Sequence, residues 1–319
     1  MVKIKIERKK FVIRKYKKSD EKRLLKVMNE TFFRNETPEY FKWKYLDNPY
    51  GSLIIIIEND RGEIVGHMGH QIKNSLYDQK VYPLLNTCDM GIIKEYRGLG
   101  LSGKFYLLSP KTPHVRIGFP NSSAIYSYKK FDDDFNQRSR IIQLDLRIKK
   151  YNWFQRSIIN FSSDAEYKIN LASIDDEKKL NEFWNSKKDE YKDGVIRDYD
   201  YLKWRVFASP SNMSLYTIEY SNKIIGYFVL LIKEKAGYIV DVLILNEFMT
   251  RELFSRIEKI FIKNGASKIQ IATNDVALLS ILKTKKYKTT SLMNVLSYNR
   301  IERGKIFEPY LTLLDTDSL

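Results

Sequence analysis

The sequence has one cysteine, no long apolar run and fewer acidic than basic residues. Because Cys88 stands alone, no disulfide can form within the chain and no cysteine cluster can hold a metal, so we expect a reducing compartment. No run reaches the roughly 18 apolar residues of a membrane span, and the run at 53–57 has the length of a strand. The first residues lack the apolar core of a signal peptide. We therefore expect a cytoplasmic protein that is not inserted in a membrane and needs no metal.

The net charge of +16 reflects 55 lysines and arginines against 39 aspartates and glutamates in 319 residues. A positive surface attracts polyanions, which include phosphorylated cofactors and nucleic acid. Basic residues that are spread over solvent-exposed faces would give the same net charge without any polyanionic partner. The basic segment 3–18 also lacks the Arg-Gly or Ser-Arg repeats of many nucleic-acid-binding segments. Nucleic acid is therefore not the partner we expect. The length predicts two domains, and a hydrophobic content of 43% is sufficient for their cores.

A glycine-rich segment, 96–104, lies between an apolar strand at 88–93 and a helical run that begins at Lys104. Glycines at such a turn let several backbone N–H groups point at one spot, and a helix N-terminus adds its dipole, so the segment suits a phosphate group. A turn that only caps the helix is the structural alternative. Two common phosphate loops do not fit. Phe105 stands where a Walker A loop needs Ser or Thr, and several predicted strands and helices come before the glycines, unlike a dinucleotide-binding fold.

The pattern that fits is Arg-x-x-Gly-x-small, at Arg97, Gly100 and Ser102. It resembles the acyl-CoA pyrophosphate loop of the GNAT (GCN5-related) N-acetyltransferase superfamily, with Ser102 where Gly or Ala is usual. The resemblance implies that loop amides hold the diphosphate, that the preceding strand pairs with the pantetheine arm, and that an N–H near Ile92 stabilises the oxyanion. The residues implied to bind the cofactor are Ile92, Ile93, Arg97, Gly98, Leu99, Gly100, Leu101, Ser102, Gly103, Lys104 and Asn121.

A second family signal follows a predicted strand, 114–119, which ends at Pro120. Asn121 can cap the next helix, and this is the structural reading of that residue. In GNAT enzymes an Asn at this turn, with Ala three residues later and Tyr seven residues later, marks the helix beside the CoA arm, and Ala124 and Tyr128 match. The resemblance implies that Tyr128 protonates the departing thiolate. A phenol suits this role because its pKa of about 10 keeps it protonated at neutral pH.

Direct attack of an amine on an acetyl thioester also needs a base, because the amine arrives as an ammonium ion. Asp89, on the strand before the loop, is the first candidate, and a turn or surface position is its structural alternative. His67 and His70 on the neighbouring strand come next. Their spacing of three places the imidazoles on opposite strand faces, so they cannot both line the site or form a metal pair. Cys88 is expected to be a buried apolar residue rather than an acyl carrier.

The order of predicted elements recurs with an offset of about 160 residues, which indicates an internal duplication. Segment 40–44 with Pro49 in the first half matches segment 201–205 with Pro210 in the second. We predict an α/β (α+β) fold with two tandem GNAT-like domains, each a mixed, mostly antiparallel twisted sheet flanked by helices. The expected boundaries are 1–148 for the domain with the acyl-CoA site, 149–166 for a connector and 167–319 for the second domain.

The second half departs from the family pattern. It has no Arg-x-x-Gly loop at 246–250, and its helix at 274–277 keeps Asn and Ala but has Ile281 where the Tyr would be. We expect a degenerate copy that does not bind CoA. Within the first half, Ser19 is expected to cap a helix and a pair of strands is expected over 81–93.

The function that these features predict is an acetyl-CoA-dependent N-acetyltransferase that acts on a primary amine of a small molecule. An amino sugar or a sugar nucleotide is one possible acceptor. The alternative is an aminoacyl-tRNA-dependent peptidyl transferase, whose family also pairs two GNAT-like domains but would not require the CoA loop. A third reading is a non-catalytic protein that binds CoA or nucleic acid. The acceptor and the oligomeric state are not determined by the sequence.

Overall fold

The computed structural model describes residues 1–6, 8–121, 124–125, 137–147, 167–191, 193–302, 305 and 307–316. They form two compact units, and both units draw on distant parts of the chain. Unit 1 comprises Met1–Ser75, Val81–Ser139 and Val295–Phe307, and unit 2 comprises Leu76–Lys80, Arg140–Asn294 and Glu308–Leu319. The expected connector 149–166 lies outside the described residues, so the boundaries predicted from the sequence stay a prediction.

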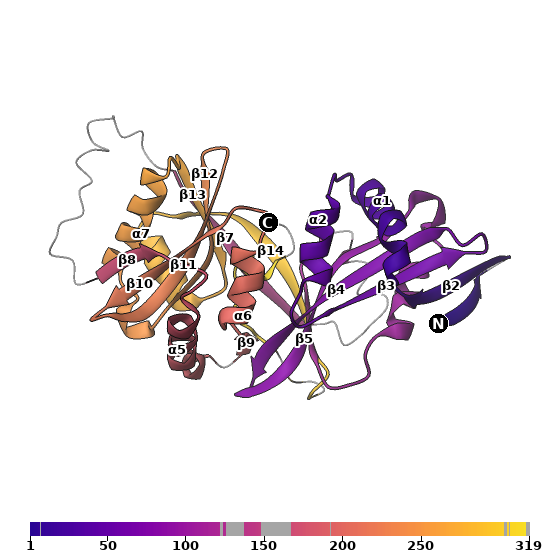
Figure 1. Ribbon diagram of the computed structural model, residues 1–319, viewed down its shortest axis with the longest axis horizontal. Helices are drawn as coiled ribbons and strands as arrows, with labels where there is room; N and C mark the ends of the chain where they lie inside the picture. The colour runs from indigo at the N-terminus through magenta and orange to yellow at the C-terminus, as the bar shows by residue number, and fades with distance from the viewer. Residues whose placement is uncertain are drawn as a thin grey trace. The chain divides into compact units, whose positions relative to one another are not determined.

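Unit 1 is built on a mixed sheet with the strand order β1-β2-β3-β4-β5-β6-β14. Figure 1 labels β2, β3, β4 and β5 of this sheet. Strands β5 and β6 pair in parallel, whereas β1–β2, β2–β3, β3–β4 and β6–β14 are antiparallel. The strands are β1 (Val2–Ile6), β2 (Lys9–Lys15), β3 (Ser52–Asn59), β4 (Ile64–Tyr77), β5 (Lys80–Ile92), β6 (Val115–Gly118) and β14 (Lys288–Asn299), of which the part from Val295 on belongs to unit 1. The helices are η1 (Lys18–Asp20), α1 (Glu21–Phe32), α2 (Pro38–Phe41), the π-helix η2 (Lys42–Leu46), η3 (Lys94–Tyr96) and the 3-10 helix η4 (Leu101–Leu108).

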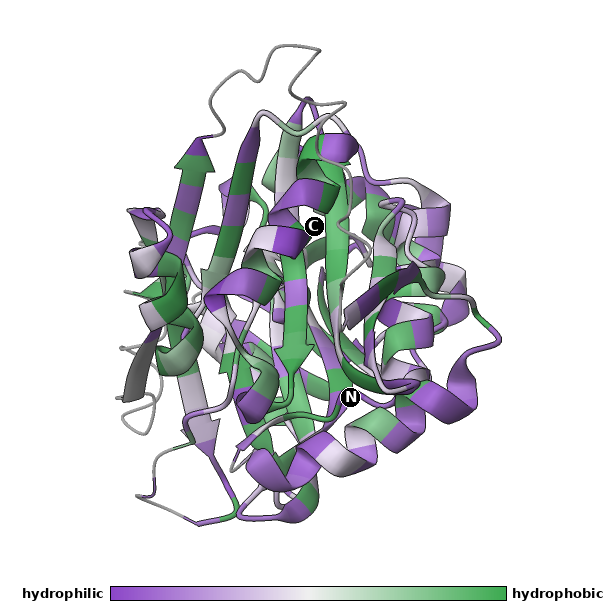
Figure 2. Cartoon of the chain, turned by 90° about the vertical axis from the view of Figure 1, so that its left-hand side faces the viewer, coloured by the Kyte–Doolittle hydropathy of each residue, from purple (hydrophilic) through white to green (hydrophobic). Residues whose placement is uncertain are grey.

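Strand β3 is apolar from Leu53 to Ile57 because both of its faces are covered there. Ile54 and Ile56 pack with residues of α1 and α2 on one face, and Ile55 and Ile57 pack with Leu101 of η4 on the other. A sheet that is covered on both sides needs a continuous apolar run rather than an alternating one. Figure 2, in which elements of unit 2 face the viewer, shows a comparable pattern there, since green predominates along the strands while the helices carry both colours.

Two local expectations for unit 1 are wrong. The predicted strand pair over 81–93 is one strand, β5, because the hairpin turn lies earlier, at Asp78 and Gln79, whose φ angles of 49° and 60° suit a tight turn. The residue before α1 is Asp20, not Ser19. The carboxylate of Asp20 accepts hydrogen bonds from the backbone N–H of Lys17 at 2.8 Å and from Arg14 at 2.7 Å.

Unit 2 repeats this plan with the strand order β7-β13-β12-β11-β10-β8. Strands β12 and β13 are parallel, as β5 and β6 are in unit 1. The strands are β7 (Gln137–Arg147), β8 (Tyr167–Leu171), β9 (Asp193–Val195), β10 (Ser214–Tyr220), β11 (Lys223–Lys233), β12 (Ala236–Ile244) and β13 (Lys268–Thr273). The helices are α5 (Glu177–Lys187), η6 (Lys188–Glu190), α6 (Tyr199–Leu202), the π-helix η7 (Lys203–Phe207), η8 (Asn246–Phe248), α7 (Arg251–Lys263), α8 (Val276–Thr284) and η9 (Leu313–Asp315).

The internal duplication is visible in an uncommon detail of the backbone. In each unit a one-turn α-helix, α2 or α6, continues directly into a π-helix, η2 or η7. The side chains of Thr37 and Asp198 cap the two α-helical turns, and Trp43 and Trp204 are buried at matching positions. Because π-helices are rare, their occurrence at the same place in both units supports the duplication and a tandem fold.

Each unit takes one strand from the other half of the sequence. Strand β7 pairs with β13 of unit 2 from Arg147↔Lys268 to Ile142↔Thr273. Strand β14 pairs with β6 of unit 1 over the four residues that end at Asn299. Each sheet therefore includes a strand that its own half of the chain does not supply. Within the described ranges, no helix combines the length and the apolar composition needed to cross a membrane.

Candidate functional site

The candidate site lies in unit 1, where β5 extends beyond the end of β6. The parallel pairing of these strands stops at Thr87 and Gly118, and β5 continues to Ile92. Asp89 in this extension has a φ of 46°, a left-handed conformation that is uncommon for residues other than glycine. The last residues of β5, before the glycine-rich loop, therefore have no pairing with β6.

The loop turns the chain into η4 through two glycines. Gly98 and Gly100 have φ angles of 83° and 69°, and a Cβ added at either would meet no atom within 4 Å. The glycines are therefore required by backbone conformation, and the space beside them is open. Leu101 and Phe105 are 2% and 0% exposed and anchor η4 in the core. A helix start held in this way presents N–H groups that have no acceptor within the helix.

A cavity of about 440 Å³ opens between the end of β5, the loop and the end of α1. Its lining includes several residues that the sequence predicted as cofactor ligands, namely Ile92, Arg97, Gly98, Gly100, Leu101, Ser102 and Asn121. Four other predicted residues, Ile93, Leu99, Gly103 and Lys104, are not among the described lining residues. Ile93 and Leu99 pack instead against the core cluster that contains Phe105.

Residues that the sequence did not single out also line the cavity, namely Thr31 and Phe32 of α1 together with Met90, Gly91 and Tyr96. A Cβ added at Gly91 would lie 2.5 Å from Cγ2 of Thr31, so only glycine allows α1 to come this close to β5. A glycine inside an apolar strand was the available signal, since it often marks such an approach.

Arg97 and Asn121 both have structural partners at the rim of the cavity. Nε of Arg97 donates to the carbonyl of Ile92 at 2.9 Å, which fixes the guanidinium at the end of the strand. Oδ1 of Asn121 accepts from the N–H of Ala124 at 2.9 Å, as expected of a helix cap. Tyr128 lies outside the described residues, so its assigned role stays a prediction.

Asp89 is neither a turn residue nor a surface residue, because it belongs to a buried charge network. Its carboxylate accepts from Nζ of Lys44 at 2.5 Å, from the hydroxyl of Tyr45 at 2.7 Å and from Arg34 at 3.1 Å. The side chains of Asp89 and Lys44 are both 1% exposed. Burial by itself raises the pKa of Asp89, but the charge and the hydrogen bond of Lys44 outweigh it and lower that pKa below its usual value. A carboxylate paired in this way is a weak base.

The two histidines of β4 point to opposite faces of the sheet, as predicted. His67 pairs with Ile56 and His70 with Leu53, and these two partners belong to the cores on the two faces. Only His67 adjoins the cavity, because its Cε1 would lie 3.1 Å from a Cβ added at Gly91. Burial lowers the pKa of His67 to about 4, and neither of its ring nitrogens has a hydrogen-bond partner among the described residues. Across the described ranges, no group of three or more His, Cys, Asp or Glu side chains is arranged to hold a metal.

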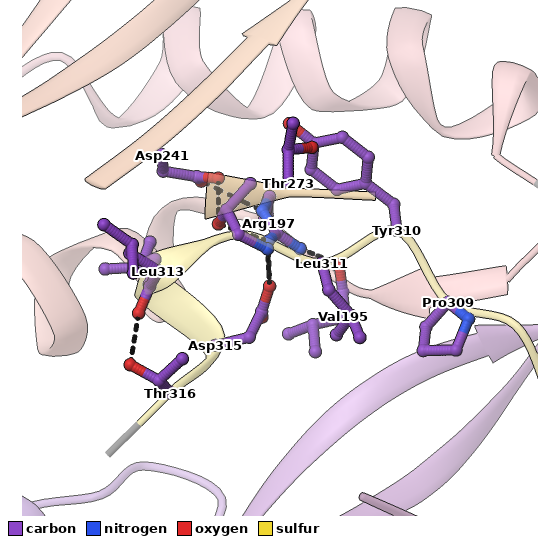
Figure 3. Close-up of polar contacts among 12 residues, drawn as sticks. Val195, Arg197, Asp241, Thr273, Pro309, Tyr310, Leu311, Leu313, Asp315 and Thr316 are labelled. Atoms are coloured by element: carbon purple, nitrogen blue, oxygen red, sulfur yellow. Dashed lines mark hydrogen bonds and ion pairs between the residues drawn. The ribbon is translucent and has the colours of Figure 1, made fainter. Parts of the chain in front are cut away.

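Unit 2 has its own buried charge network, shown in Figure 3. Nε of Arg197 donates to Asp241 at 2.9 Å, and an NH2 group of the same guanidinium donates to Asp315 at 2.6 Å. Thr312 donates to the other oxygen of Asp241 at 2.7 Å. The three charged side chains are 0% exposed. The network therefore anchors residues near the end of the chain to the sheet of unit 2.

Helix α8 is capped by a different residue from the one that caps the helix after β6. Asp275, not Asn274, accepts the hydrogen bond from the N–H of Leu278, at 2.7 Å. The side chain of Asn274 instead contacts the backbone of Pro309 and Leu311. The strand register still places Asn274 at the position that corresponds to Asn121, since Gly118 pairs with Thr87 as Ile271 pairs with Ile239. The capping role has therefore moved to the next residue, Asp275.

No protein-family model matches the chain, and no curated protein matches its sequence. Solved structures match over most of its length. A probable N-acyltransferase from Enterococcus faecalis V583 gives a TM-score of 0.68 at 13% identity, covering 92% of this chain and 73% of that one. A GCN5-related N-acetyltransferase from Anabaena variabilis ATCC 29413 gives 0.65 at 14% identity, covering 90% and 72%.

The N-myristoyltransferase of Saccharomyces cerevisiae, solved with bound myristoyl-CoA, also matches, with a TM-score of 0.58 at 11% identity, covering 91% of this chain and 82% of that one. The chain therefore has the fold of GNAT N-acetyltransferases, as the sequence predicted, and also that of N-myristoyltransferase. At these identities the similarity shows the fold alone.

Proposed function

We propose that unit 1 binds an acyl-CoA and transfers its acyl group, an acetyl group, to a primary amine of a small molecule. The observation that carries this proposal is the cavity at the end of β5 that extends beyond its pairing with β6, which the loop with Gly98 and Gly100 lines. A diphosphate is the ligand that an open loop of main-chain amides at a helix start recognises best. The net charge of +16 adds attraction for a polyanionic cofactor.

The roles of the rim residues follow from this placement. The N–H groups at Gly98–Ser102 would hold the diphosphate, and Arg97, exposed and fixed to the carbonyl of Ile92, would add positive charge. The pantetheine arm would lie along the extension of β5, whose main chain would pair with it as an added strand does. The thioester would then lie near Ile92, where a backbone N–H would stabilise the oxyanion.

Proton transfer requires a base for the ammonium and an acid for the thiolate. Among the predicted bases, His67 is the one whose position fits, because it lies next to Gly91 of the cavity and its ring nitrogens have no partner among the described residues. Its pKa of about 4 makes the buried imidazole a weak base in the free protein, so it is assigned the proton of the ammonium on position alone. Asp89, held by Lys44, would fix the conformation of β5 rather than accept a proton. Tyr128 remains the proposed acid.

Calorimetry and thermal unfolding with acetyl-CoA, and with tRNA as the competing ligand, test the proposal. Acetyl-CoA at a hundredfold over its Kd should stabilise the protein by about 2.7 kcal/mol, and Arg97→Ala should reduce this effect. Release of free thiol would then be followed with amino sugars, aminoglycosides and amino acids. Tyr128→Phe should lower turnover about 100-fold with little loss of CoA binding. Stabilisation by tRNA and not by acetyl-CoA would reject the proposal.

A further inference from the structure

Unit 2 contains a second cavity, of about 420 Å³, at the place in its fold where unit 1 has the acyl-CoA cavity. Its floor, Val242–Ile244 at the end of β12, corresponds to Met90–Ile92 at the end of β5. The end of α5 and the start of α8 form two of its walls. Residues Glu308 and Tyr310, near the end of the chain, form another. Figure 3 shows Tyr310 on the segment that the Arg197 network fixes.

The charge of this cavity is the reverse of what coenzyme A needs. Met249 lies where unit 1 has Arg97, Thr250 caps α7 where unit 1 has the glycine loop, and α8 is capped by the carboxylate of Asp275. Four carboxylates line the cavity, from Glu190, Asp193, Asp275 and Glu308. The one lysine of the lining, Lys187, pairs with Glu190. In a chain with a net charge of +16, such a surplus of negative charge selects for a cation.

A second, independent observation comes from Tyr191, which lines the cavity and is 6% exposed. Its ring is held edge-on by Trp184 and Tyr310, with ring centres 5.8 Å and 5.2 Å away. Its buried hydroxyl has no hydrogen-bond partner in the part of the chain that the structure describes. A rigid hydroxyl that is buried without a partner costs stability unless a ligand supplies the partner.

We propose that the cavity of unit 2 binds a small primary ammonium compound with an apolar body. The ammonium group donates to the hydroxyl of Tyr191 and to the carboxylates of Asp275 and Glu308. The apolar body packs on the side chains of Val242 and Met249. This site is separate from the acyl-CoA cavity, so binding there does not depend on the transfer reaction proposed for unit 1.

Calorimetric titration of the full chain with n-hexylamine, hexan-1-ol and hexanoate tests this proposal, because the three probes share a body and differ in charge. We expect n-hexylamine to bind at least about tenfold more tightly than hexan-1-ol, and hexanoate not to bind. Asp275→Asn keeps a helix cap but removes a charge, and Tyr191→Phe removes only the hydroxyl. Each should weaken n-hexylamine binding about five- to tenfold.

The free protein provides a further readout. Tyr191→Phe should leave the melting temperature unchanged or raise it, because it removes a hydroxyl that has no partner, and a merely structural tyrosine would not combine this result with weaker amine binding. Arg97→Ala is the control for unit 1 and should weaken CoA binding while n-hexylamine binding stays unchanged. Equal affinity for the amine and the alcohol, no binding of the amine, or amine affinity unaffected by both variants would overturn the proposal.

Discussion

Asp89 of β5 and Asp241 of β12 occupy the same position in their units, three residues before the end of the strand. Each accepts a hydrogen bond from a buried phenol, Tyr45 at 2.7 Å in unit 1 and Tyr227 at 2.8 Å in unit 2. The phenols come from different elements, because Tyr45 belongs to the π-helix η2 and Tyr227 to the strand β11. The two copies have thus kept the aspartate while changing its partners.

The cation that pairs with the aspartate has also changed, from Lys44 in unit 1 to Arg197 in unit 2. Unit 2 has no glycine loop at the corresponding turn, yet its aspartate is as deeply buried as that of unit 1. A residue that is kept with and without the loop is better explained by the architecture of the strand than by catalysis. This agrees with the role that we propose for Asp89.

Lys44→Met should lower the free energy of unfolding by about 3–5 kcal/mol, because the carboxylate of Asp89 then stays buried without its buried cationic partner. Lys42→Met is the matched control in the same π-helix, since Lys42 is 65% exposed and lies 3.9 Å from Asp47. It should cost at most about 1 kcal/mol. Urea denaturation measures both changes, and equal effects of the two variants would contradict a buried pair that matters for stability.

Gly100→Ala should weaken acyl-CoA binding, because alanine resists the φ of 69° and its methyl group would enter the open space beside the loop. Gly51→Ala provides the control, since Gly51 has a φ of 82°, is equally open and lies outside the cavity lining. Both variants should lose about 1–2 kcal/mol of stability, but only the first should lose CoA affinity. An equal loss of CoA affinity in the two variants would mean that the substitutions act by destabilising unit 1 as a whole and not by changing the loop.

His67→Leu should lower acyl transfer at pH 7 about 100-fold without lowering the melting temperature. The imidazole is buried with no partner among the described residues, so an aliphatic side chain of similar size satisfies the fold equally well. Asp89→Asn is the comparison, and we expect it to reduce stability as well as activity, because it weakens the pairing with Lys44. Full activity of the His67 variant would remove this residue from the proposed mechanism.

Asp20→Asn should reduce the free energy of unfolding by about 2 kcal/mol at pH 7, and the difference should vanish near pH 2. The hydrogen bond from Arg14 lowers the pKa of Asp20 from 3.8 to about 2 in the folded protein. A lowered pKa means that the ionised carboxylate stabilises the fold above the pKa of the unfolded chain. That stability is lost as the pH falls from about 4 through about 2. Urea titrations at several pH values would show whether the two proteins converge.

Much of the architecture could be predicted because its signals are local or repeated. The apolar run at 53–57 indicates a strand covered on both faces, and the match of Trp43 with Trp204 indicates a duplication before any contact is known. The positive φ angles at Gly98 and Gly100 are also local properties, since they depend on what glycine permits. Such features are encoded in neighbouring residues.

The sequence by itself therefore determined the two-fold GNAT-like plan and the position of the loop. Only the tertiary structure decided which strand completes each sheet, which cation neutralises Asp89, and that Tyr191, Asp275 and Glu308 meet around one cavity. The physical reason is that these contacts join residues far apart in the chain. Their partners are chosen by burial and packing of the whole unit, whereas spacing along the sequence reports only on each segment's own conformation.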